Sequence, residues 1–297
     1  MDKFDDILSN SAPDEQQSGQ QYSKEEYAAK KKDEREELYS RLDATAMEVA
    51  SHPFDFQQYL DLQSRLGRYT AVNTLLVLSK NPEAERLGDL NFWRGQKVFI
   101  KKEELRNPIQ ILEPGDQYRR DDGTIGTYYN IKQVYDISQA ERKILPPSQP
   151  KHTERQIIQA LISKYPLKIM GVDDLPDNHG AMTNPDGEIL VRKGMEFSDT
   201  FRSVAYEMAC AEVATDPELS QEQEFSAYSA TYMLCKKYGA DTQGFNFDRV
   251  GDVFDGMDAQ EVKGELSQIR DAADAISGRM AKQLDAVQKA ARTQEAR

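Results

Sequence analysis

The sequence has few of the residues that build disulfide frameworks, membrane spans or histidine-rich metal sites. Its 297 residues include 2 cysteines, 3 histidines and 1 tryptophan. Cys210 and Cys235 lie in apolar, helix-like surroundings, which fits a reducing compartment and not a disulfide scaffold. No apolar run approaches the length of a membrane span, and the acidic N-terminus MDKFDDILSN lacks the features of a signal peptide. We therefore expect a cytoplasmic protein that does not bind membranes.

Strings typical of catalytic or ion-binding loops are also missing. The chain contains no glycine-rich phosphate loop, nucleophile elbow or EF-hand string. His52, His152 and His179 fall in three separate segments, so their spacing is not that of a metal site. The net charge of −13 argues against the coating of duplex DNA. We expect no cofactor.

The negative charge is unevenly distributed. Residues 60–102 carry 8 basic against 4 acidic groups, and the chain is acidic on both sides of this stretch. Single-stranded DNA binding needs cations for phosphates and exposed rings for bases, and this stretch supplies both. The candidate DNA-binding residues are Arg65, Arg68, Tyr69, Asn73, Arg86, Trp93, Arg94, Lys97, Lys101 and Lys102. The alternative is that Tyr69 and Trp93 are core aromatics and that the lysines lie on an ordinary solvated strand face.

The N-terminal half changes from a helical to an alternating apolar pattern. After a polar tail at 1–22, which predicts disorder, the capping box of Ser23 and Glu26 begins a charged helix that ends before Pro53. Two further helices are expected at about 54–66 and 70–80. Alternation then predicts strands at 96–101, 108–112 and 127–137, the last two joined by a long loop.

The proline-rich segment Leu145–His152 predicts a boundary between two domains. We expect a tail at 1–22, domains at 23–145 and 153–245, a linker at 146–152 and a helical tail at 246–297.

The second domain is expected to contain helices at about 153–164, 198–214 and 221–238, a strand at 167–172 and a hairpin that turns at Asn184–Gly187. Ser198 or Asp199 is the predicted N-cap of the second of these helices. The last forty residues form an amphipathic helix, which either packs on its own domain or forms a dimeric coiled coil.

The stretch Phe201–Ala214 has the pattern of a zinc peptidase helix without its zinc ligands. Such a helix carries His at i and i+4 to bind the metal and Glu at i+1 as the base. Those positions hold Tyr206, Glu207 and Cys210. Because a neutral phenol with a pKa near 10 is a poor zinc ligand, we favour a helix used for packing over an unusual Tyr/Cys metal site. Cys210 is interpreted as a buried residue and not as a reactive thiol.

Two strings resemble ArdC-type antirestriction proteins. Arg65–Trp93, together with Thr127–Gln139, resembles the single-stranded-DNA-binding domain of that family. The order of elements after it resembles the zincin-like metallopeptidase domain that follows in the family, and the whole resemblance covers about 40–240. It implies that the third ligand position, a Glu in the family, is Tyr228 here. All three ligand positions have then changed, and only Glu207 remains.

These arguments predict an α+β protein in which a helical and β-sheet DNA-binding domain precedes a degenerate zincin-like domain and a long amphipathic helix. The vestigial site residues are Tyr206, Glu207, Cys210 and Tyr228. The resemblance implies an antirestriction or DNA-transfer role in a mobile element, with single-stranded DNA as the partner and no enzymatic activity. Two alternatives stay open: an acidic adaptor or inhibitor that binds a host defence nuclease, and a zinc metallopeptidase with Tyr and Cys ligands.

Overall fold

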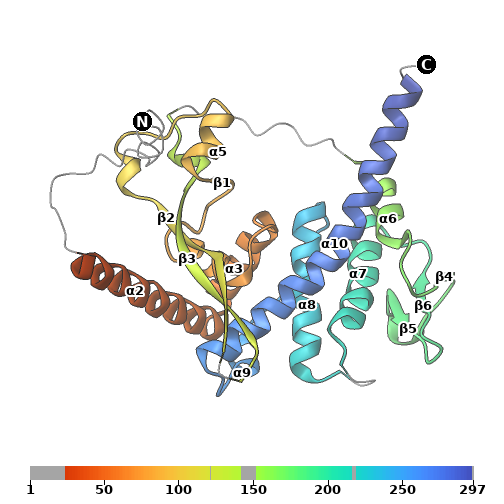
Figure 1. Cartoon of the computed structure of the whole chain (residues 1–297). Helices are drawn as coiled ribbons and strands as arrows, with labels where there is room; N and C mark the ends of the chain where they lie inside the picture. Colours follow the sequence, from red (N-terminus) through yellow and green to blue (C-terminus); the bar gives the residue numbers. More distant parts are fainter. Residues whose placement is uncertain (1–23, 121, 142–151, 216–218, 296–297) are drawn as a thin grey trace. The chain divides into compact units, whose positions relative to one another are not determined.

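The computed structural model describes residues 24–120, 122–141, 152–215 and 219–295 (Figure 1). The predicted disordered tail, Ser23 of the capping box and the proline-rich linker up to residue 151 lie outside the described residues. The chain divides into two compact units, Met1–Glu37 and Leu38–Arg297. The second unit contains both cores and all candidate site residues.

The predicted α+β class is confirmed by helices that accompany two small sheets. The first sheet is antiparallel in the order β1-β3-β2, and the second has the order β4-β6-β5 with β4 parallel to β6. The strands are β1 (Leu87–Gly88), β2 (Ile109–Arg119), β3 (Ile125–Asp136), β4 (Ile169–Val172), β5 (Ala181–Thr183) and β6 (Ile189–Arg192).

The helices of the N-terminal half begin and end close to the predicted positions. They are α2 (Lys24–Ser51), α3 (Pro53–Arg65) and α4 (Ala71–Leu78), whereas the short α5 (Leu90–Gly95) was not predicted. Pro53 occupies the first turn of α3, where its missing N–H costs nothing. The side chains of Thr70 and Asp89 cap α4 and α5, because they accept hydrogen bonds from the backbone N–H groups of Asn73 and Phe92, respectively.

Two predictions about the first sheet were wrong. Residues 96–101 form no strand, and only Ile100 makes an isolated bridge, to Ala140. Lys97 has a φ of 57°, so the chain turns away from an extended path directly after α5. The expected long loop is also mostly strand, because β2 continues to Arg119 and β3 starts at Ile125. A register shift between Pro114 and Gln117 lets the pairing continue.

The C-terminal half contains the expected helices. They are α6 (Glu154–Ile162), α7 (Phe197–Val213), α8 (Gln221–Tyr238) and α10 (Ala259–Glu295), whereas the short α9 (Val250–Val253) was not predicted. 3₁₀ turns occur at Glu104–Arg106, Ile137–Gln139 and Pro176–Asn178. The predicted N-cap of α7 was wrong, because Glu196 occupies that position. The Ser198 hydroxyl instead accepts a hydrogen bond from the backbone of Asp241, and Asp199 pairs with Arg202.

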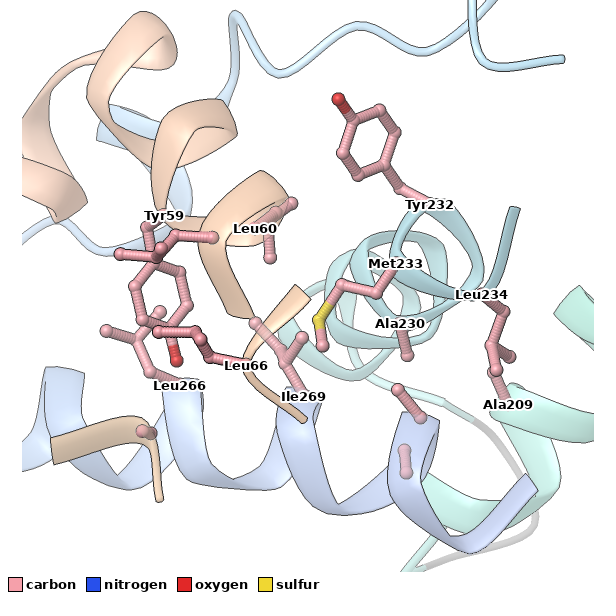
Figure 2. Packing of buried hydrophobic residues seen from close by; sticks show 14 of the residues in the cluster. Tyr59, Leu60, Leu66, Ala209, Ala230, Tyr232, Met233, Leu234, Leu266 and Ile269 are labelled. Carbon is pink, nitrogen blue, oxygen red and sulfur yellow. The ribbon is translucent and has the colours of Figure 1, made fainter. Parts of the chain in front are cut away.

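One hydrophobic core connects the two halves of the chain. Helices α3 and α10 pack against α8, and Met233 of α8 lies beside Ile269 of α10 (Figure 2). The apolar stripe of α10 is buried against its own chain from Val262 to Leu284, which supports packing on its own chain over the coiled coil. The division into two domains at the linker stays a prediction. None of the described helices is long and apolar enough to cross a membrane.

Candidate functional site

Trp93 is a core residue, and its predicted role as a DNA-stacking ring was wrong. It is 1% exposed and packs in a second, smaller core with Val98, Ile100, Tyr135 and Ala140. Its indole N–H donates to the carbonyl of Tyr135 over 3.0 Å. A ring whose face is covered and whose polar atom is satisfied cannot stack on a base without local unfolding.

Two further candidates also hold the fold together. The buried Asn73 amide donates to the carbonyl of Leu112 over 2.9 Å and accepts from its N–H over 2.8 Å, so it pairs with β2 as a neighbouring strand would. Arg65 donates to the carbonyls of Pro82 and Ala84, which fixes the turn after α4. The amide of Asn73 is therefore committed within the chain, as are Nε and Nη2 of the exposed Arg65.

The string Tyr135–Ser138, which supports the family resemblance, is structural as well. The Asp136 carboxylate is buried and accepts from the backbone N–H groups of Glu85, Arg86 and Ser138. The Tyr135 hydroxyl donates to the carbonyl of Leu105. These bonds tie β1 and the 3₁₀ turn to the end of β3.

Four of the remaining basic candidates lie close in sequence to an exposed ring that the sequence analysis missed. In residues 94–102, here called the basic loop, Phe99 is 63% exposed between the buried Val98 and Ile100. The loop contains four cations and no acidic residue. Those cations are Arg94, Lys97, Lys101 and Lys102. The strand predicted at 96–101 would place Val98 and Ile100 on one face and Phe99 on the other, so this pattern could have identified the exposed ring. Trp93 was chosen as the stacking residue instead.

Most of these cations are available to a partner. Arg94, Lys97 and Lys102 are exposed, and their side chains form no hydrogen bond or ion pair with any residue that the structure describes. The Lys101 ammonium donates to the carbonyl of Ser138 over 3.3 Å. Arg86, in contrast, places its guanidinium over the rings of Phe92 and Trp93, so part of its capacity is used within the chain.

A separate open groove of about 450 Å³ lies between α4, α5 and the β2–β3 ribbon. Arg68 and the half-buried Tyr69 line it together with Lys132. The Lys132 ammonium is 2.8 Å from Glu113 and 3.4 Å from Asp89, and the hydrogen bond that it donates to Glu113 raises its pKa. Arg68 forms no such pair in the described chain, so it is the free cation of this groove.

The β2–β3 ribbon carries two exposed rings on the groove side. Tyr128 and Lys132 are four residues apart on β3, so the strand period of two places them on one face. Tyr118 pairs with Gly126 on the same face, and its ring centroid is 4.3 Å from that of Tyr128. Any side chain at Gly126 would collide with the Tyr118 ring, which explains the glycine there. Neither tyrosine was predicted as a site residue.

Three of the four residues predicted for a zincin-like site, Tyr206, Glu207 and Tyr228, line one cavity of about 310 Å³ beside α7 and α8. Its walls include Tyr206, Glu207, Tyr228, Phe245, Arg202 and His179. One oxygen of Glu207 accepts from the N–H and the hydroxyl of Thr183 on β5, over 2.9 and 2.7 Å. The Tyr228 hydroxyl accepts from the backbone N–H of Asn246 over 2.8 Å. Cys210 does not line this cavity but shares a hydrogen bond with Tyr206.

The donor set at the predicted zincin ligand positions does not fit a resident zinc ion. Thiol and phenol must lose their protons to bind the metal. Burial raises the pKa of Cys210 to about 12, and burial also raises the pKa of Tyr206 above its usual value. Both groups are therefore neutral at pH 7. In the part of the chain that the structure describes, no group of three or more His, Cys, Asp or Glu residues could hold a metal ion.

Comparison with solved structures finds a likeness to crystal structures of the antirestriction protein ArdC from plasmid R388. The metal-free structure is 14% identical, with 72% of this chain and 84% of that chain covered and a TM-score of 0.44. The Mn(II)-bound structure is 13% identical, with 72% of this chain and 85% of that chain covered and a TM-score of 0.43. At these values the likeness assigns neither family nor function. No protein-family model matches the chain, and no curated protein does.

Proposed function

We propose that this protein binds single-stranded DNA through the basic loop. The observation that supports this is the exposed Phe99 ring in a segment, residues 94–102, that contains four basic residues and no acidic one. Sequence-tolerant single-strand binding combines cations for the phosphates with ring faces for the bases. An exposed phenylalanine ring leaves apolar surface in contact with water, and stacking on a base would remove that surface from water, which is favourable.

The groove with Arg68 and Tyr69 offers a second contact for the strand, and the Tyr118–Tyr128 pair extends its face along the ribbon. Lys132 is paired with Glu113 and Asp89, and these carboxylates reduce the positive charge with which the groove can attract a phosphate. The basic loop therefore supplies most of the salt-dependent affinity, and the groove supplies mainly stacking. A flexible single strand can follow these local surfaces, whereas a stiff duplex meets the acidic remainder of the chain.

In cellular terms, we propose an antirestriction or DNA-transfer role, which rests on the sequence resemblance to ArdC-type proteins. The zincin-like half takes part without metal catalysis, because its phenol and thiol groups stay protonated. An acidic adaptor for a host defence nuclease remains the alternative if DNA does not bind.

A titration of the full-length protein with a fluorescent 20-nucleotide single strand, followed by anisotropy, tests the proposal. Phe99→Ala should weaken binding by about 1–3 kcal/mol if the ring stacks on a base. Phe54→Ala is the matched control, because Phe54 is 73% exposed on α3 outside the basic loop. The double variant Arg94→Gln, Lys97→Gln should flatten the salt dependence, with exposed Arg155→Gln as its control.

Duplex of the same sequence should bind more weakly than the single strand. Absence of single-strand binding at low salt, or equal losses for Phe99→Ala and Phe54→Ala, would show that the basic loop is not a DNA site. Circular dichroism confirms that each variant is folded.

A further inference from the structure

The cavity at the vestigial zincin residues remains a defined site without a metal. Its volume of about 310 Å³ lies within the range of small-ligand pockets, which are mostly apolar with a few placed polar groups. Tyr206 comes from α7, Tyr228 from α8 and Phe245 from the segment after α8. The rings of Tyr228 and Phe245 are packed together, with centroids 4.8 Å apart and planes at 48°. Aromatic side chains therefore contribute three of its walls.

The carboxylate in this cavity is held in place and keeps one oxygen for a ligand. Both Thr183 bonds go to Oε2 of Glu207, and Oε1 has no hydrogen-bond partner in the described chain. Glu207 follows Tyr206 directly in α7, so the carboxylate and one aromatic wall are fixed by the same turn of helix. Such a carboxylate is poised to accept from, or pair with, a bound group.

The charges around the cavity favour a cation. Arg202 also lines it, but the Arg202 guanidinium is 2.6 Å from the carboxylate of Asp199, which matches its charge. Burial is the largest cause that raises the pKa of Tyr206 and of Cys210, and the negative charges of Glu207 and Glu224 raise both pKa values further. His179 lies at the exposed side. An anion would meet Glu207 with only a paired arginine to compensate.

We propose that this cavity binds an organic ammonium group, held against the faces of Tyr206, Tyr228 and Phe245 and paired with Glu207. Aromatic faces attract alkylammonium ions, whereas they offer no ligand atom to a transition metal. This inference is independent of DNA binding by the basic loop.

Calorimetric titration of the full-length protein with choline, and separately with its uncharged isostere 3,3-dimethylbutanol, tests the proposal. The two ligands have the same shape, so their difference isolates the charge. Choline should bind at least about tenfold more tightly. Glu207→Gln should remove about the same factor, whereas Glu196→Gln, at the exposed N-cap of α7, should leave binding unchanged.

Variants of the aromatic walls separate ring contacts from folding. Tyr228→Phe keeps the ring and should keep choline binding. Tyr228→Leu should lose choline binding while its circular dichroism spectrum remains that of a folded chain. If Tyr228→Leu does not fold, Glu207→Gln and the isostere comparison still decide. A short peptide with trimethyllysine, compared with one carrying norleucine, shows whether the cation is free or attached to a polypeptide, and tighter binding of either cation supports the site. Equal affinities for choline and its isostere, or full affinity in Glu207→Gln, would overturn the proposal.

Discussion

Tyr232 of α8 donates its hydroxyl hydrogen to the carboxylate of Asp61 on α3 over 2.7 Å. Gln57 donates to the same hydroxyl over 3.1 Å, and the Lys236 ammonium is 3.0 Å from the same carboxylate oxygen. Tyr232 is 1% exposed, and burial raises its pKa, with Asp61 as a further cause. The bond joins two helices that the sequence analysis assigns to different domains, so it couples their stability.

Replacing this hydroxyl should therefore destabilise the whole unit. Tyr232→Phe should lower the free energy of unfolding by about 2 kcal/mol, because a hydrogen bond to a charged group is lost and Asp61 keeps only its lysine. Urea unfolding followed by far-ultraviolet circular dichroism measures the change. Tyr39→Phe is the control, since Tyr39 is an exposed tyrosine. An unchanged midpoint for Tyr232→Phe would mean that α3 and α8 are not held by this bond.

Trp93 should report on its core and not on DNA. It is the sole tryptophan, so its emission is observed without subtraction. We expect blue-shifted emission, weak quenching by acrylamide and no change when single-stranded DNA is added. Trp93→Ala should cost about 3–5 kcal/mol of stability by leaving a cavity. Strong quenching by DNA in the folded protein would contradict the buried position.

The two cysteines should be unreactive in the folded protein. Burial raises the pKa of both Cys210 and Cys235 to about 12, so both thiols stay protonated at pH 8. Alkylation by iodoacetamide at pH 8 should be slow in buffer and fast in urea. Rapid modification of either thiol in buffer would show that it is accessible as a thiolate.

The same raised pKa values predict a loss of stability in alkali. In the unfolded chain the thiols lose their protons near the ordinary pKa of 9.0, while in the folded chain they keep them up to a pKa of about 12. The unfolded state is therefore favoured as pH rises between about 9 and 12, and stability is fully present below that window. Urea midpoints measured across this range should fall, and Cys235→Ala should reduce the slope.

The protein purified from zinc-containing medium should carry well under one zinc per chain, because its phenol and thiol groups are neutral. Atomic absorption measures the content. Stoichiometric zinc that disappears in Cys210→Ala would contradict this. The triple variant Tyr206→His, Cys210→His, Tyr228→Glu should gain zinc affinity if the backbone of α7 and α8 has kept a metal-binding geometry.

Local patterns in the amino acids were enough to place most elements. Apolar spacing of three and four residues identified α8 and α10, and the residues that avoid helices, such as Pro53 and Gly239, marked where helices begin or end. These signals are short-range, because they depend on backbone geometry within a turn or two. The spacing of a known motif singled out Tyr206, Glu207 and Cys210, and the family resemblance added Tyr228; Tyr206, Glu207 and Tyr228 line one cavity, whereas Cys210 does not.

Contacts between distant segments decided what each candidate residue does. Trp93 and Phe99 are both aromatic residues in a basic stretch, yet packing against Tyr135 buries the first and leaves the second exposed. Asn73 was a candidate DNA-binding residue, but in the folded chain both polar groups of its side chain form hydrogen bonds with the backbone of Leu112, 39 residues away. Burial depends on which segments meet in the folded chain, and no local pattern contains that information.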